Sequence, residues 1–157
     1  LVENICTLFV NKFATKAGMI KNKESQDFAD QVLKKNGTKY HSRNQLISEL
    51  SGGNMQKVVV AREFSFDSPV LIIAQPTRGV DVGAIEFIHT RIIEKRNAGC
   101  AILLCSADLD EVFRLSDRII TMYEGRITGE FRTNDITKEE IGWYMTGHRE
   151  GKEAART

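Results

Sequence analysis

A short run with two adjacent glycines is the first place in the sequence where chemistry is expected. Gly52 and Gly53 let a backbone approach a ligand closely, and Ser51 before them can cap a helix that begins there. The N-terminus of such a helix presents unpaired N–H groups and the positive end of the helix dipole, which suit a phosphate. The same residues, followed by Asn54, also fit an ordinary helix cap after a flexible turn. The run alone leaves both interpretations open.

Two short continuous apolar runs predict strands, and a polar segment follows the first of them. Val70–Ala74 precedes the segment Gln75–Asp81, and Ala101–Cys105 is the second run. Strands without alternation are typical of a parallel sheet that is buried on both faces. Isoleucines at helical spacing lie between the runs and end before Gly99. Strand, helix and strand together predict a βαβ unit.

The remaining elements follow from periodicity and capping residues. We expect an amphipathic helix at the start of the chain (Val2 to Phe13), a helix over Lys23–Asn36 capped by Asn22, a helix capped by Asp108, a β-hairpin with strands Arg118–Tyr123 and Arg126–Phe131, and a last helix with a capping box of Thr137 and Glu140. His89 lies on the apolar face of the isoleucine helix, so packing is the better interpretation of this histidine.

Composition limits the classes of protein to consider. The 157 residues are 41% hydrophobic and 27% charged, which is typical of a globular domain. The 22 basic and 21 acidic side chains give a net charge of +1, so there is no electrostatic reason to expect a nucleic-acid partner. No apolar run is long enough to cross a bilayer. The three cysteines have no nearby ligands for a metal site, and we expect them to be free, buried thiols.

Three stretches, taken in order, resemble the ATP-binding cassette family. They are Leu50–Gln56, which resembles the signature motif, the strand followed by Gln75-Pro76-Thr77 and Asp81, and Ser106–Leu109 before Asp117 and Arg118. The resemblance covers about Gln45 to Phe131, and the helices before it resemble the family's helical subdomain. Gln75–Ala84 looks most like the second cassette of fused two-cassette ATPases that power sugar and nucleoside uptake. Ala84–His89 leans toward the nucleoside and simple-sugar branch.

The resemblance implies a fold and a domain organisation. We expect a partial P-loop NTPase fold of the α/β class, in which parallel strands with flanking helices follow a helical subdomain. Residues 1–60 would form that subdomain, residues 61–147 the C-terminal part of the α/β core, and residues 148–157 a polar tail. No Gly-x-x-x-x-Gly-Lys-Ser/Thr phosphate loop occurs in the chain. We therefore expect the chain to be a segment of a longer protein, with strand edges left exposed.

The resemblance also implies binding residues. In the family the signature motif contacts ATP that the opposite cassette holds. Ser51, Gly52 and Gly53 would therefore supply donors to that ATP in trans, beside Asn54, which stands where Gln is commoner. Gln56 would belong to the same nucleotide-contacting run. Asp81 would be the D-loop residue that links the two composite sites.

Three positions depart from the family's catalytic pattern. Ala74 stands at the Mg²⁺-associated aspartate, and a methyl group cannot hold the metal's water shell. Gln75 stands at the catalytic glutamate, and an amide cannot accept a proton from water at neutral pH. Ala107 stands at the switch histidine and has no donor. We expect this half to be degenerate and inactive alone, so that the partner cassette holds the Mg²⁺.

The leading hypothesis is a fragment of the energy-coupling subunit of an importer for simple sugars or nucleosides. Its partners would be the opposite cassette and transmembrane permease subunits, and its place would be peripheral, at the cytoplasmic face of the membrane. Two alternatives stay open. One is a non-transport cassette of the kind found in DNA repair and translation, and the other is a regulatory pseudo-ATPase module.

Overall fold

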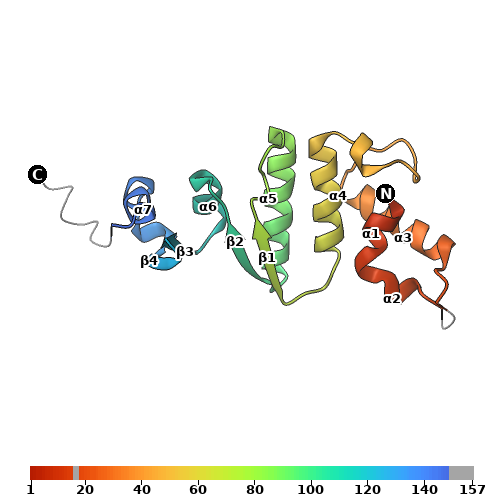
Figure 1. Ribbon diagram of the computed structural model, residues 1–157, viewed down its shortest axis with the longest axis horizontal. Coiled ribbons are helices and arrows are strands. Elements are labelled where there is room, and N and C mark those ends of the chain that lie inside the picture. The colour runs from red at the N-terminus through yellow and green to blue at the C-terminus, as the bar shows by residue number, and fades with distance from the viewer. Residues whose placement is uncertain (16–17, 149–157) are drawn as a thin grey trace, which may run out of the picture. The chain divides into compact units, whose positions relative to one another are not determined.

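The computed structural model describes residues 1–15 and 18–148 of the chain. Their elements are α1 (Val2–Cys6), η1 (Thr7–Phe9), α2 (Val10–Phe13), α3 (Asn22–Lys35), η2 (Ile47–Glu49), α4 (Gly52–Phe64), β1 (Val70–Ala74), α5 (Val82–Asn97), β2 (Ala101–Cys105), α6 (Leu109–Leu115), β3 (Arg118–Tyr123), β4 (Arg126–Arg132), η3 (Thr133–Asp135) and α7 (Lys138–Met145) (Figure 1). Two compact units divide the chain, Leu1–Leu103 and Leu104–Thr157. The expected polar tail, residues 148–157, falls outside the described residues except for His148.

A small helical core holds the first unit together. Its buried members come from α1, α2, α3 and α4, and they are Ile5, Cys6, Phe13, Ala29, Val32, Leu33, Leu50, Val58 and Ala61. Phe28 of α3 adds edge contacts, with ring centroids 4.8 Å from Phe9 and 5.3 Å from Phe13. Arg62 of α4 also donates a hydrogen bond of 3.0 Å to the Asn4 side chain of α1. Helix α4 is thus fixed to the core along its length, by Val58 and Ala61 and by Arg62 in its last turn.

The first helix departs from the prediction. A single helix from Val2 to Phe13 is wrong, because the backbone tightens into a 3₁₀ turn at Thr7–Phe9 between α1 and α2. At the start of this turn the Thr7 hydroxyl donates a 2.8 Å hydrogen bond to the Glu3 carbonyl. Asn22 also does not cap α3, because it is the first residue of that helix and Lys21 takes the N-cap position.

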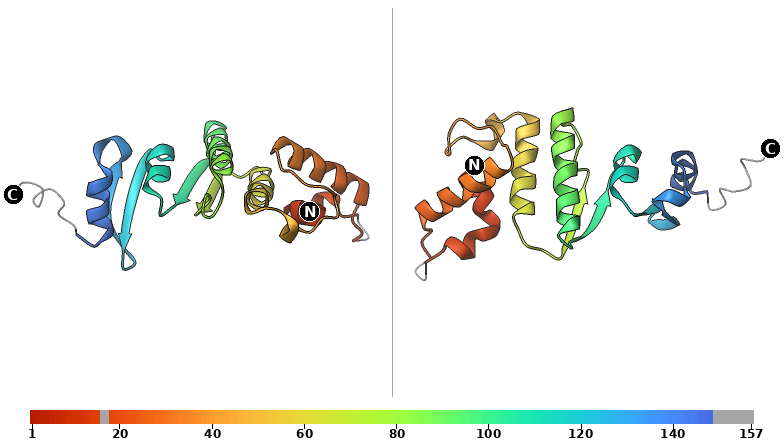
Figure 2. Two further views of the ribbon diagram at one scale, coloured as in Figure 1. Left: turned by 90° about the horizontal axis from the view of Figure 1, so that it is seen from above. Right: turned by 180° about the vertical axis from the view of Figure 1, so that it is seen from behind.

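Helix α4 forms despite a poor local propensity. Val58, Val59 and Val60 are weak helix formers, yet α4 runs unbroken from Gly52 to Phe64. Val58 and Val60 are buried, so packing against the neighbouring helices outweighs the propensity cost. In Figures 1 and 2, α4 lies beside α5, and Lys57 of α4 stands over the Phe87 ring of α5 with its Nζ 5.4 Å from the ring centroid.

Strands β1 and β2 form a two-stranded parallel sheet joined by α5, which confirms the βαβ prediction. The prediction that both faces of this sheet are buried is not met among the described residues. Alternate side chains are exposed, with Val70 at 56%, Ile72 at 70% and Leu103 at 53% of their full accessibility. The described residues place two strands in this sheet, so these side chains have no cover on its faces. Each strand also has one edge without a partner strand among the described residues, as expected.

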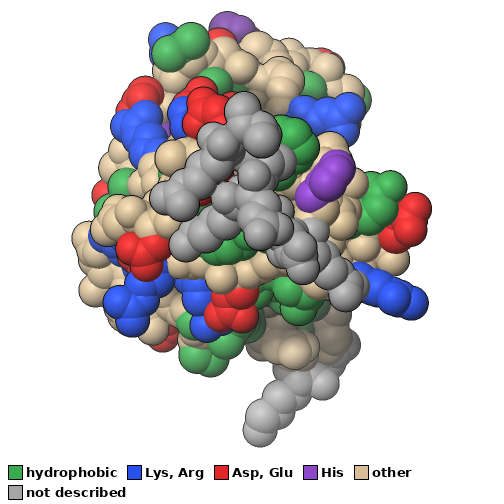
Figure 3. Space-filling model, turned by 90° about the vertical axis from the view of Figure 1, so that its left-hand side faces the viewer, with side chains coloured by type: hydrophobic (Ala, Val, Ile, Leu, Met, Phe, Trp, Pro, Cys, Tyr) green, Lys and Arg blue, Asp and Glu red, His purple; other side chains and the backbone are tan. Residues whose placement is uncertain are grey.

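The second unit is a hairpin packed against a helix. β3 and β4 pair antiparallel, from Arg118 opposite Arg132 to Tyr123 opposite Arg126, as predicted. Glu124 and Gly125 between them both have positive φ, 46° and 74°, which matches the right-handed twist of hairpin strands. The Asp108 cap of α6 and the capping box of α7 are both confirmed. Figure 3 shows Lys and Arg side chains interspersed with Asp and Glu on one face.

The three cysteines are free, but they differ in exposure. Cys6 is buried in the helical core, and burial raises the pKa of its thiol. Cys105 is exposed at the end of β2, so the expectation that all three thiols are buried is wrong. No helix within residues 1–15 and 18–148 is long and apolar enough to span a membrane.

Candidate functional site

Ser51 stands at the N-cap of α4, with the Gly-Gly pair forming the first turn. Its backbone is extended (φ −62°, ψ 154°), and its hydroxyl oxygen accepts a hydrogen bond from the Asn54 backbone nitrogen at 3.4 Å. Ser51 and Gly52 are exposed, whereas Gly53 is buried. The helix that follows has thirteen residues, and the positive end of its dipole lies at Ser51 and Gly52.

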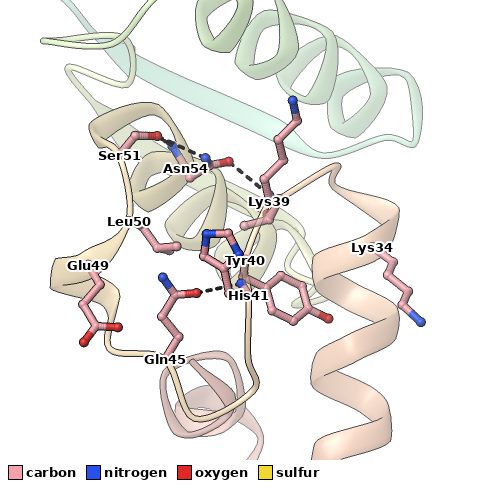
Figure 4. Close-up of a pocket in the computed structure, with 10 residues that line it drawn as sticks. Lys34, Lys39, Tyr40, His41, Gln45, Glu49, Leu50, Ser51 and Asn54 are labelled. Carbon is pink, nitrogen blue, oxygen red and sulfur yellow. Dashed lines mark hydrogen bonds between the residues drawn. The ribbon is translucent and has the colours of Figure 1, made fainter.

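A network of side-chain bonds surrounds the Ser51 hydroxyl. The Asn54 side-chain nitrogen Nδ2 donates to Ser51 Oγ at 3.0 Å. On its other side, Asn54 Oδ1 accepts from the Lys39 backbone nitrogen at 3.1 Å. Figure 4 shows Ser51 and Asn54 facing each other at the start of α4, with the Lys39 backbone passing beside them. The loop before the signature run Leu50–Gln56 is therefore fastened to the signature itself.

Asp81 lies against Gly53 of the signature run. It is the N-cap of α5, where its Oδ1 accepts from the Ala84 nitrogen at 2.9 Å. A Cβ atom added to Gly53 would lie 2.5 Å from Asp81 Oδ2, so a side chain here would force the Asp81 carboxylate to shift. A Cβ on Gly52 would lie 3.7 Å from the Gly79 carbonyl, an ordinary contact. The structure thus brings Gly53 and Asp81, which are far apart in sequence, into contact.

Gln56 makes the second link between the two motifs. Its Nε2 donates to the Pro76 carbonyl at 2.8 Å. Pro76 is buried, and the residue before it, Gln75, has φ of +49°. The left-handed conformation is uncommon for a residue with a side chain. Gln56 therefore braces the turn that follows β1 and does not reach toward the open end of α4.

Ala74, Gln75 and Ala107, the three positions expected to depart from the catalytic pattern, lie at or just after the ends of β1 and β2. Ala74 is the last residue of β1, and Gln75 begins the turn after it. Ala107 belongs to the second unit, on the exposed turn between β2 and α6. Within the described parts of the chain, no group of three or more His, Cys, Asp and Glu side chains could hold a metal ion. The residues present therefore do not fit a Mg²⁺ site of their own.

A pocket of about 670 Å³ opens beside the signature run. Its lining residues come from α3, the loop before the signature and the start of α4, and they are Lys34, Thr38, Lys39, Tyr40, His41, Gln45, Glu49, Leu50, Ser51 and Asn54. Two lysines against one glutamate favour an anionic occupant. Tyr40 is fixed by its hydroxyl, which donates 3.1 Å to Asp30 Oδ1, and burial together with this carboxylate raises the tyrosine's pKa.

Some contacts of this site were not foreseen from the sequence. The Lys39 bond to Asn54 and the Gly53 approach to Asp81 join residues that are distant along the chain, so no local pattern announces them. The adjacent glycines were the one available signal of a close approach. His89 is buried on α5, as its place on the isoleucine face predicted.

Comparisons with known proteins agree with this geometry. No protein-family model matches the chain. The guanosine import ATP-binding protein of Bacillus subtilis is 50% identical over 107 residues, which are 68% of this chain and 21% of that protein. The ribose import ATP-binding protein of the same organism is 42% identical over 147 residues, 94% of this chain and 30% of that protein. The chain thus spans less than a third of the curated relatives it matches.

A solved structure shows the same fold. A dimeric ATP-binding cassette in a post-hydrolysis state, bound to ADP and phosphate, superposes with a TM-score of 0.63 at 25% identity, covering 74% of this chain and 50% of that one. The two motifs joined by Gly53 and Asp81, the partial α/β fold and the importer relatives lead to one conclusion: the chain belongs to the ATP-binding cassette family, with sugar and nucleoside import ATPases among its relatives.

Proposed function

We propose that this chain is the C-terminal part of the second cassette in an importer ATPase for simple sugars or nucleosides. In this proposal the signature run donates hydrogen bonds to the γ-phosphate of an ATP molecule that the opposite cassette holds. The observation that carries it is the geometry of Ser51 and Gly52, exposed at the N-terminus of a thirteen-residue helix. A phosphate at such a helix end is stabilised by backbone N–H groups and the helix dipole.

Two residues at the end of β1 support the direction in trans. Ala74 and Gln75 cannot provide the metal ligand and the proton acceptor that phosphoryl transfer needs. In the proposal, the opposite cassette holds both the nucleotide and its Mg²⁺, and this chain completes the enclosure. Relatives named for ribose and guanosine import support a cytoplasmic, membrane-peripheral place beside permease subunits.

An equilibrium binding experiment tests the proposal. A fluorescent, non-hydrolysable ATP analogue with Mg²⁺ is titrated with this chain alone, and then with a cassette that carries a phosphate loop. We expect this chain alone to bind weakly or not at all, and its addition to tighten binding by the partner. Ser51→Arg places a bulky side chain where the phosphate would lie and abolishes the tightening.

A matched control separates this effect from the loss of a helix cap. Thr137→Ala removes the cap of α7 in the second unit at a cost of about 1 kcal/mol, the same kind of loss that Ser51→Arg causes at α4. The proposal requires Thr137→Ala to bind as the wild type does. Tight binding by this chain without a partner would overturn it.

A regulatory pseudo-ATPase is the second candidate, and the three substitutions Ala74, Gln75 and Ala107 favour it. Restoring them together as Ala74→Asp, Gln75→Glu and Ala107→His in the full protein decides between a degenerate and an active site. If the degenerate-site proposal holds, the restored protein hydrolyses ATP faster than the wild type. A wild type that already hydrolyses ATP at both composite sites would contradict the asymmetry.

A further inference from the structure

The Asn54 side chain determines what the Ser51 hydroxyl can do. A backbone N–H only donates, so the Asn54 atom that faces the Lys39 nitrogen at 3.1 Å must be the carbonyl oxygen. The amide nitrogen therefore faces Ser51, at 3.0 Å from its Oγ. The orientation of this amide follows from the chemistry of its neighbours.

The Ser51 oxygen accepts two hydrogen bonds on the protein side. One comes from the Asn54 backbone nitrogen and the other from Asn54 Nδ2. A hydroxyl has two lone pairs and one proton, so both lone pairs are used. The proton has no acceptor in Asn54 and is left to point outward, toward the exposed end of α4. Ser51 is thus preset as a donor to whatever lies there.

We propose that Asn54 is a positioning residue, which holds the Ser51 hydroxyl as an outward donor and fastens the Lys39 loop to the signature run. This inference rests on the proposed function, because the acceptor it names is a phosphate oxygen. The pocket beside the run, lined by Lys39, Ser51 and Asn54 together, is the space that the acceptor would enter.

Asn54→Asp is the sharpest test, because it keeps the shape of the side chain and reverses one hydrogen bond. The carboxylate still accepts from the Lys39 nitrogen, but its second oxygen now faces Ser51 and can only accept. The Ser51 proton then turns inward. A negative side chain in the first turn of a helix is favourable for the dipole, so the fold and its melting temperature are kept.

The expected result is measured with the fluorescent ATP analogue and the partner cassette. A hydrogen bond to a charged group corresponds to about tenfold to hundredfold in affinity, and Asn54→Asp should weaken partner-dependent binding by that factor. Asn44→Asp is the matched control, since it is the same substitution at an exposed residue that does not line the pocket. Binding by Asn44→Asp should stay within about threefold of the wild type, because an exposed charge outside the pocket is screened by salt.

Hydrogen exchange at the Lys39 amide gives a second measurement that needs no nucleotide. Asn54 Oδ1 protects this amide in the wild type, Asn54→Asp retains the protection and Asn54→Ala removes it. Equal exchange in the wild type and Asn54→Ala would overturn the inference, and so would an Asn54→Asp affinity equal to that of Asn44→Asp. A wild type without partner-dependent binding would instead refute the proposed function, while the Lys39 exchange still decides the hydrogen-bond clamp.

Discussion

Adding one methyl group to the signature run tests the contact between the two motifs. In Gly53→Ala the new Cβ would lie 2.5 Å from Asp81 Oδ2 and 3.5 Å from Ala84 Cβ. The carboxylate must swing away, and Asp81 then gives up its cap of α5. In Gly52→Ala, one residue earlier, the new Cβ would lie 3.7 Å from the nearest atom, the Gly79 carbonyl. The two variants make the same substitution in the same helical turn.

The magnitude follows from the difference between the two variants. Replacing Gly by Ala in a helix gains up to about 1 kcal/mol, and this gain is common to both positions. Losing an Asp cap costs about 1 kcal/mol, and residual crowding adds about 1 kcal/mol more. We therefore expect the free energy of unfolding of Gly53→Ala to fall about 1–2 kcal/mol below that of Gly52→Ala.

Urea denaturation followed by circular dichroism measures both free energies, and Asp81→Ala completes the cycle. With Asp81→Ala in the background the obstacle is gone, so Gly53→Ala should become as well tolerated as Gly52→Ala. The coupling energy between Gly53 and Asp81 should then be about 1–2 kcal/mol. Equal stability of the two glycine variants with Asp81 intact would refute the contact.

Three other outcomes can be measured on the same chain. Asp108→Ala removes the acceptor for two backbone N–H groups of α6 and should lower the free energy of unfolding by about 1 kcal/mol; no change by urea denaturation would contradict the cap. Cys105 should be alkylated before Cys6, because Cys6 is buried and its raised pKa leaves less thiolate. If mass spectrometry showed alkylation of Cys6 first, the burial of Cys6 would be contradicted. The pKa of Tyr40 should lie above its ordinary value of 10.0. The neutral tyrosine therefore stabilises the fold below pH 10.0, and this contribution is lost as pH rises through the raised pKa. Asp30→Asn should lower the pKa of Tyr40 in a spectrophotometric titration, and an unchanged titration would contradict the hydrogen bond.

Local signals predicted the local parts of the fold. The hairpin strands follow from the apolar runs on either side of Glu124-Gly125, and the caps at Asp108 and Thr137 follow from side chains that reach N–H groups two or three residues ahead. Such features depend on neighbours in sequence, so a single sequence contains them. The 3₁₀ turn at Thr7–Phe9 was not predicted, because the apolar period continues through it and no Gly or Pro marks it.

Other features of the fold depend on packing between segments that are distant in sequence, which local patterns do not predict. The valines 58–60 are helical because α4 buries two of them, although their propensity disfavours a helix. The exposed faces of β1 and β2 could be anticipated only from the strands expected beside them. The Asn54 bond to Lys39 and the Gly53 contact with Asp81 depend on the loop path and the α4–α5 approach, which no spacing rule encodes.

Photo-crosslinking tests whether the signature run contacts ATP that the opposite cassette holds. An ATP analogue with a photoreactive group on its γ-phosphate is loaded on a phosphate-loop cassette, this chain is added, and the labelled peptide is identified by mass spectrometry. We expect labelling of residues 50–56, lost in Ser51→Arg and lost when the phosphate-loop lysine of the partner is replaced. Labelling of the segment 70–81 or 106–108 instead, or labelling that persists without the partner, would contradict it.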